Sequence, residues 1–352
     1  LASPFNPKAA SWTKGRRGLV AEIKKHMEHE TQERLWFHCA SLGEFEQGRP
    51  VLEAFKKAYP HYKIVLTFFS PSGYEARKKH GAADYIFYMP LDTRANAKKM
   101  IELLKPQAVF FIKYEFWYHY FKQLRIRDID VFLISAIFRP NQHFFKPYGW
   151  LFKEILDSVS HFFVQNGQSA YLLESNGYRN VTISGDTRFD RVLHIAEQKK
   201  DIPVIRDFKQ DGLLLVAGST WPDDEALLTH VYNRFPQLKL VIAPHEIDDD
   251  HLNRLLDMYE DSAVLYSKAS TVDLANKHLL IIDSIGMLAQ IYRYADVAYV
   301  GGGFGKGIHN VLEPATYGIP VVFGPHYHKF QEAVRLIELG GAFSFEEKEM
   351  LE

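Results

Sequence analysis

The chain is poor in cysteine and contains no long apolar run. Cys39 is its single cysteine, which excludes an intramolecular disulfide and any metal site built from several cysteines. It closes the apolar run from Leu35, so we expect a small buried side chain rather than a nucleophile. No stretch approaches the roughly 18 consecutive apolar residues of a membrane-spanning helix. These absences favour a reducing, cytoplasmic setting.

The chain also carries almost no net charge: its 42 Lys and Arg residues and 43 Asp and Glu residues give a formal net charge of -1. This balance argues against nucleic acid as a partner, which usually requires a basic excess. The balance hides a division: residues 1–190 carry 27 basic and 19 acidic side chains, net +8, and residues 191–352 carry 15 and 24, net -9. One half is therefore expected to face an anionic surface or substrate, unless the asymmetry is only uneven surface composition.

A length of 352 residues predicts two domains at about 150 residues each. Short apolar runs alternate with helix-length amphipathic stretches, which is typical of an α/β protein with parallel sheets. The expected strands are 35–39, 63–68, 108–112, 131–135, 161–164 and 181–184, then 213–217, 238–243, 263–266, 279–282, 297–300 and 320–323. We therefore predict two doubly wound domains of about six strands each, residues 1–190 and 191–352, with a boundary in the polar stretch 186–211. Ligands should bind in a cleft outside the carboxyl ends of the strands.

The most informative segment is a glycine-rich loop that follows the strand 297–300. It contains Gly301, Gly302, Gly303, Gly305 and Gly307, and His309, Asn310 and Glu313 come next, at the start of an expected helix. Backbone amides of the loop and the helix start favour a phosphate, and a carboxylate at the position of Glu313 can accept ribose hydroxyls. The loop fits neither the P-loop nor the dinucleotide fingerprint. The alternative is that the glycines only form a tight structural turn and bind no phosphate.

Other polar groups follow other expected strands. They are Ser41, Gly43 and Glu44 after the first strand, Lys113 and Glu115 after 108–112, Ser219 and Thr220 after 213–217, and His245 after 238–243. The Ser219 and Thr220 hydroxyls can contact a phosphate or cap a helix. The acidic residues from Glu246 to Asp250, beside His251, are interpreted as a solvated helix start rather than a metal site.

These segments resemble the 3-deoxy-D-manno-octulosonic acid (Kdo) transferases of lipopolysaccharide synthesis over nearly the whole chain. The matching segments are 41–44, 114–117, 185–190, 218–220, 301–303, 309–314, 322–326 and Phe330. The resemblance implies a GT-B fold, in which the N-terminal Rossmann-like domain binds the acceptor and the C-terminal one binds the nucleotide sugar. Family members usually begin with a hydrophobic anchor, which is expected to be missing here.

Glu44 is the expected catalytic base, because inverting glycosyl transfer needs a carboxylate to take the proton of the acceptor hydroxyl. The resemblance implies the same role, and a helix-start residue stabilised by the dipole is the alternative. Ser41, Gly43, Lys113 and Glu115 are expected to contact the acceptor or support Glu44. Lys113 stands where the family usually has Glu, and as a cation it can bind a phosphate or a sugar carboxylate instead. Glu115 is a second candidate or a packing residue.

The donor side is expected to consist of Ser219, Thr220, His245, Gly301, Gly302, Gly303, His309, Asn310 and Glu313, with no metal and no cofactor. A departing CMP can be stabilised by amides and cations alone. The expected function is inverting Kdo transfer from CMP-Kdo to a lipid A precursor, at the cytoplasmic face of the inner membrane, held by its anionic surface. The alternatives are a UDP-sugar transferase or 2-epimerase of the same fold, and a non-catalytic lipid-binding protein.

Overall fold

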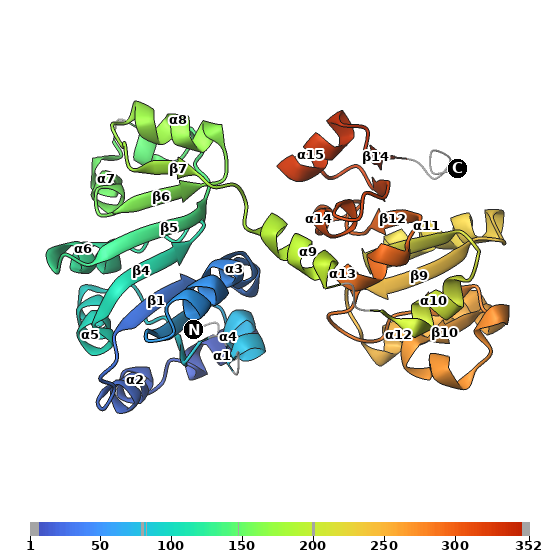
Figure 1. Ribbon diagram of the computed structural model, residues 1–352, viewed down its shortest axis with the longest axis horizontal. Coiled ribbons are helices and arrows are strands. Elements are labelled where there is room, and N and C mark those ends of the chain that lie inside the picture. Colours follow the sequence, from blue (N-terminus) through green and yellow to red (C-terminus); the bar gives the residue numbers. More distant parts are fainter. Residues whose placement is uncertain (1–6, 79–80, 82, 147, 199–200, 347–352) are drawn as a thin grey trace. The chain divides into compact units, whose positions relative to one another are not determined.

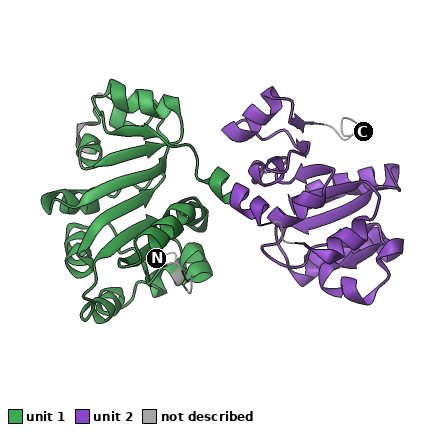
Figure 2. Ribbon diagram, in the orientation of Figure 1, with its two compact units in different colours: residues 1–191 green, residues 192–352 purple. Residues whose placement is uncertain are grey.

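The computed structural model describes residues 7–78, 81, 83–146, 148–198 and 201–346, and it contains two compact units. Unit 1 is Leu1–Arg191 and unit 2 is Val192–Glu352 (Figure 2). The division falls within the helix α9 (Arg188–Glu197), so the polar stretch expected to be a linker is partly helical.

Unit 1 is built on one parallel sheet of seven strands in the order β3-β2-β1-β4-β5-β6-β7 (Figure 1). The strands are β1 (Arg34–Cys39), β2 (Lys63–Phe68), β3 (Tyr85–Tyr88), β4 (Pro106–Ile112), β5 (Asp130–Ala136), β6 (His161–Val164) and β7 (Val181–Ile183). The helices are α1 (Pro7–Lys14), α2 (Leu19–Met27), α3 (Leu42–Ala58), α4 (Pro71–Arg77), α5 (Arg94–Leu104), α6 (Tyr118–Ile126), α7 (Trp150–Leu156) and α8 (Gly167–Ser175). The first six strands follow the doubly wound order.

Both faces of the unit 1 sheet are buried, which explains its near-continuous apolar strands. Along β1, Leu35 and Phe37 belong to the core on the α3 face, and Trp36 belongs to the core on the face covered by α5 and α6. Every residue of β1 is buried. Period-two alternation of side chains therefore supplies two cores from one strand.

Unit 2 repeats this plan with a second parallel sheet of seven strands, ordered β10-β11-β9-β8-β12-β13-β14. Its strands are β8 (Leu214–Thr220), β9 (Lys239–Pro244), β10 (Ala263–Leu265), β11 (Leu279–Ile281), β12 (Val297–Val300), β13 (Val321–Phe323) and β14 (Ala342–Ser344). Its helices are α10 (Pro203–Lys209), α11 (Pro222–Arg234), α12 (Asp249–Tyr259), α13 (Leu288–Ile291), α14 (Leu312–Ala315) and α15 (Gln331–Glu338). Leu214 and Leu215 point into separate cores, so this sheet is also covered on both faces.

The prediction of α/β architecture with parallel sheets is confirmed, but the count of about six strands per sheet was one short in each unit. The additional strands are β3 and β14, which lie at the edges of their sheets. Within the described part of the chain, no helix is both long and apolar enough to cross a membrane.

Candidate functional site

The carboxyl end of β1 presents Glu44 in the first turn of α3. Ser41 is the N-cap, and its hydroxyl accepts a hydrogen bond from the Glu44 amide at 3.4 Å. In return Glu44 Oε2 accepts the Ser41 amide at 3.0 Å, which completes a capping box. Glu44 therefore stabilises the helix start, the role we named as the alternative. A capping carboxylate remains able to accept a proton, so the two roles are compatible.

The surroundings of Glu44 favour its neutral form. Burial, followed by the negative charge of Glu115, raises the pKa of Glu44 to about 7, although Lys113 and the capping hydrogen bonds act in the opposite direction. A carboxylate with a pKa close to the working pH is suited to accept a proton during a reaction and release it afterwards. Gly43 is exposed beside it, and a Cβ there would meet no atom closer than Ser41 Oγ at 4.0 Å. Packing therefore does not require this glycine.

Glu115 contacts two rings: Trp117, which lies in the matching segment 114–117, and His38, which the sequence did not single out. Trp117 Nε1 donates a hydrogen bond to Glu115 Oε2 at 2.8 Å, and His38 Nε2 lies 3.4 Å from the same oxygen. His38 is fully buried in β1, and its Nδ1 is 2.8 Å from Thr67 Oγ1, which also accepts a hydrogen bond from Trp36 Nε1. Glu115 is therefore a fixed carboxylate whose charge acts on Glu44.

Lys113 follows β4 in a left-handed conformation with φ of 69°. Its Nζ lies 5.1 Å from the centroid of the Tyr114 ring, and Arg139 Cζ lies 5.8 Å from the same centroid. Non-glycine residues adopt this conformation at a cost and are concentrated at functional sites. Two cations and two carboxylates thus gather at the carboxyl edge of the unit 1 sheet.

The matching segment 185–190 anchors α3 to the end of unit 1. Gln47 Nε2 donates to Asp186 Oδ1 at 3.1 Å, and the Thr187 hydroxyl donates to the Gln47 carbonyl at 2.5 Å. The residue before Gln47, Glu46, pairs with Arg77 at 2.7 Å. This segment supports the helix that carries Glu44.

In unit 2 the glycine loop differs from the expectation. Gly301, Gly302 and Gly303 are buried, the Gly301 amide donates to the Gly218 carbonyl at 2.9 Å, and the Gly302 amide donates to Asp224. The expected helix is present but short: α14 has four residues, and Glu313 lies in its first turn. The amides of Gly301 and Gly302 therefore hold the loop together. Gly303 is required by packing, since a Cβ there would lie 2.6 Å from the Gly324 backbone.

Asp224 organises this loop from the first turn of α11. Its Oδ2 accepts the amides of Trp221 and Gly302, both at 2.9 Å, and its Oδ1 accepts the Tyr299 hydroxyl at 2.6 Å. Burial raises the pKa of Asp224 although these three hydrogen bonds lower it. One carboxylate thus connects the start of α11, β12 and the glycine loop.

Trp221, His245 and His309 form a stack beside the loop. The ring centroids of Trp221 and His245 are 4.7 Å apart, and those of His245 and His309 are 4.4 Å apart. His309 Nε2 accepts a hydrogen bond from Trp221 Nε1 at 3.1 Å. Burial, followed by His245, lowers the pKa of His309 to about 4, so its imidazole is neutral at pH 7. Two of the predicted donor residues are therefore brought together.

The remaining predicted donor residues have different surroundings. Thr220 is fully buried and its hydroxyl donates to Glu225 Oε1 at 2.9 Å, so this side chain stabilises the interior and we drop it as a ligand contact. Ser219 is partly exposed with φ of 55°. Asn310 accepts the Leu312 amide at 3.1 Å and donates to Glu313 at 3.1 Å, so it fixes the carboxylate of Glu313.

The acidic segment before α12 is a helix start. Asp248 is the N-cap and accepts the His251 amide at 3.0 Å. His251 is buried and its Nε2 lies 2.8 Å from Glu225 Oε2. Among the residues that the structure describes, no group of three or more His, Cys, Asp or Glu side chains is placed to hold a metal ion.

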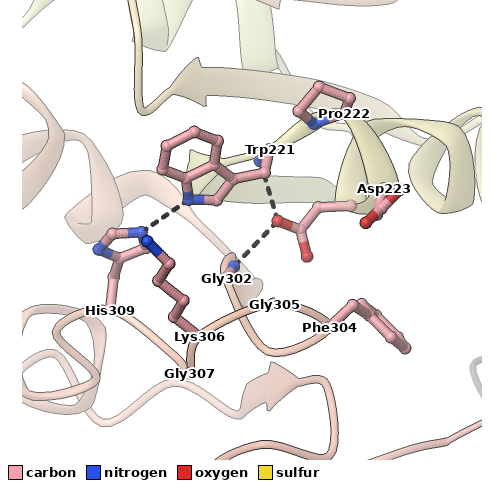
Figure 3. A pocket seen from close by; sticks show the side chains of 10 residues that line it. Trp221, Pro222, Asp223, Gly302, Phe304, Gly305, Lys306, Gly307 and His309 are labelled. Atoms are coloured by element: carbon pink, nitrogen blue, oxygen red, sulfur yellow. Dashed lines mark hydrogen bonds between the residues drawn. The ribbon is translucent and has the colours of Figure 1, made fainter.

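The glycine loop and the start of α11 enclose a cavity of about 530 Å³. Its lining consists of Trp221, Pro222, Asp223, Asp224, Gly302, Phe304, Gly305, Lys306, Gly307 and His309 (Figure 3). This volume is typical of a small-molecule site. Trp221 and Phe304 offer flat apolar surfaces, the exposed Lys306 offers a positive charge, and the exposed Asp223 offers a carboxylate, so the lining suits an organic molecule that has both apolar and polar groups. Trp221 and Lys306 were not singled out from the sequence, because no local pattern marks them as lining residues.

Comparisons with known proteins agree with the sequence resemblance. Residues 13–191 match the family 3-Deoxy-D-manno-octulosonic-acid transferase (kdotransferase). The 3-deoxy-D-manno-octulosonic acid transferase of Chlamydophila psittaci is 30% identical over 87% of this chain and 72% of its own length. That of Aquifex aeolicus is 28% identical over 88% of this chain and 80% of its own length.

Solved structures resemble the chain in fold. UDP-GlcNAc 2-epimerase from Methanocaldococcus jannaschii aligns with a TM-score of 0.58 at 14% identity, covering 91% of this chain and 90% of that one. At this identity the likeness shows the fold alone, which is GT-B with two Rossmann-like domains. By its matched family and its relatives, the chain belongs to the 3-deoxy-D-manno-octulosonic-acid (Kdo) transferase family of glycosyltransferases.

Proposed function

We propose that this protein transfers Kdo from CMP-Kdo to a hydroxyl of a lipid A precursor, with inversion at the anomeric carbon and without a metal ion. The observation that carries the proposal is Glu44, a carboxylate at a strand end whose pKa lies at about 7. The N-terminal domain predicted from the sequence, residues 1–190, binds the acceptor, and the C-terminal domain, residues 191–352, binds the nucleotide sugar; these bounds lie one residue from those of units 1 and 2. The family membership of the chain supports this division of roles.

In the proposed reaction Glu44 takes the proton of the acceptor hydroxyl while the oxygen forms a bond to the anomeric carbon of Kdo. The bond from that carbon to the phosphate oxygen breaks, and CMP leaves with the electron pair. Lys306 in the unit 2 cavity supplies positive charge for the phosphate, so a monophosphate can depart without a metal. Lys113 and Arg139 in unit 1 supply positive charge for anionic groups of the acceptor.

The charge of unit 1 supports a membrane-surface setting for this reaction. Residues 1–190 carry a net charge of +8, and the cytoplasmic leaflet of the inner membrane is anionic. We propose that unit 1 attaches to this leaflet, where a lipid acceptor is available.

The proposal predicts which nucleotide binds. CMP should raise the melting temperature of the protein, because the cavity of unit 2 binds the donor nucleotide, and UDP at the same concentration should have little effect. Differential scanning fluorimetry with both nucleotides makes the comparison. Stabilisation by UDP alone would instead favour a UDP-sugar transferase or epimerase of the same fold.

The proposal also predicts a pH dependence. Glu44 must be ionised to accept a proton, so kcat/KM should rise with pH on a limb whose midpoint is about 7. Glu115→Gln removes a negative charge that raises the pKa of Glu44, and should move the midpoint to lower pH. Steady-state rates from pH 5 to 9 for both proteins test this. A profile that is flat over this range would rule out Glu44 as the base.

A further inference from the structure

Unit 1 contains a second cavity, of about 500 Å³, that the proposed reaction does not use. Most of its lining is apolar or aromatic: Phe116, Tyr118, Phe144, Phe152 and Ile155. These residues come from the segment after β4, the segment after β5, and α7. The cavity therefore involves the carboxyl edge of the unit 1 sheet, where ligands of doubly wound folds bind.

The walls of this cavity are preformed. The ring centroids of Phe116 and Phe144 are 4.6 Å apart, and the rings meet edge to face. The ring centroids of His143 and Phe152 are 5.4 Å apart, and these rings are stacked. Phe144 and Ile155 are buried, whereas Phe152 is 41% exposed. The cavity thus has a packed apolar base and an exposed aromatic side, which suits an elongated apolar group that enters from solvent.

The segment 131–153, which supplies part of the cavity lining, is basic: it includes Arg139, Lys146 and Lys153 and contains no Asp or Glu. Two acids lie at the cavity, Asp92 in its lining and Glu154 next to the lining residue Ile155, and both accept hydrogen bonds. Asp92 accepts the His119 amide at 3.1 Å, and Glu154 accepts the Tyr118 hydroxyl at 2.7 Å. Cations beside an apolar cavity complement a molecule with an anionic head and an apolar chain.

The cavity is also close to the proposed chemistry along the chain. Phe116 lines it, and the preceding residue, Glu115, acts electrostatically on Glu44. An apolar chain in the cavity would hold its head group at the sheet edge that carries these carboxylates. We propose that this cavity takes one acyl chain of the acceptor lipid, an inference that rests on the proposed function.

Kinetics with two acceptors test the inference: a phosphorylated glucosamine disaccharide with its acyl chains and the same disaccharide fully deacylated. Each buried methylene strengthens binding about fourfold, so the acylated acceptor should have the much lower KM with the wild-type protein. Phe152→Asp places a charge at the cavity and should raise KM for the acylated acceptor at least about tenfold more than for the deacylated one. Tyr171→Asp, at a 69% exposed aromatic on α8 outside the cavity, is the matched control and should change neither KM.

A second measurement uses the wild-type protein and so does not depend on how the variant folds. An acceptor with a photoreactive diazirine on its acyl chain should label peptides that contain Phe116, Phe144 or Phe152, as located by mass spectrometry. Labelling confined to other peptides, or equal effects of Phe152→Asp on both acceptors, would overturn the inference while transfer itself persists. Absence of transfer to either acceptor would instead count against the proposed function.

Discussion

Glu44→Gln is expected to lower kcat by about 10²- to 10⁴-fold while CMP binding and folding are retained. The amide cannot take the proton of the acceptor hydroxyl at neutral pH. It can still accept the Ser41 amide, because Gln serves as well as Glu at the third position of a capping box. The substitution therefore separates the two roles of Glu44, whereas Glu44→Ala would remove both.

The matched control is Glu53→Gln, at a partly exposed glutamate of α3 that pairs with Arg49. It removes the same charge from the same helix and should leave turnover unchanged. Steady-state kinetics give kcat, and calorimetric titration with CMP shows whether the donor side is intact. Turnover of Glu44→Gln within threefold of the wild type would limit Glu44 to capping.

Asp224→Ala is expected to have the largest effect on unit 2. It would leave the amides of Trp221 and Gly302 and the hydroxyl of Tyr299 without their acceptor in a buried environment. At about 1–3 kcal/mol for each unsatisfied group, and with partial relaxation, we expect a loss of about 3 kcal/mol in the free energy of unfolding. The melting temperature should fall by about 10 °C. Because the glycine loop loses its anchor, CMP affinity should fall at least about tenfold.

Two further variants test whether these losses come from the hydrogen bonds of Asp224. Asp224→Asn keeps one oxygen for the two amides and can donate to the Tyr299 oxygen, so it should cost less than Asp224→Ala. Asp257→Ala, at an exposed position of α12, should change neither stability nor affinity. Thermal unfolding and CMP titration of the three variants provide the comparison. Equal behaviour of Asp224→Ala and Asp257→Ala would contradict an organising role for Asp224.

The sequence predicted the parallel sheets well because their central strands are apolar runs of six or seven residues, such as β1 and β4. The strands it missed, β3 and β14, have four and three residues and lie at sheet edges. Shortness alone does not explain why they were missed, because β10, β11 and β13 also have three residues and were predicted. Pairing with β2 and β13 defines them, and that pairing is a tertiary property.

In the candidate site, too, some features could be predicted from the sequence and others could not. Ser41 and Glu44 form a motif within four residues, so a local pattern was enough to place Glu44 at a helix start after a strand. The contacts of Glu115 with His38 and of Asp224 with Gly302 join distant segments, and no spacing rule predicts them. The acceptors of the Gly301 and Gly302 amides were unpredictable for the same reason, because they lie on distant segments of unit 2.

The most direct test of Kdo transfer is mass spectrometry of the products formed from a lipid A precursor and CMP-Kdo generated in situ. The wild-type protein should increase the mass of the precursor by one or more Kdo units, in the presence of EDTA as well as without it. Glu44→Gln should give no increment under the same conditions. A wild-type protein that binds CMP but leaves the precursor mass unchanged would contradict the proposed function.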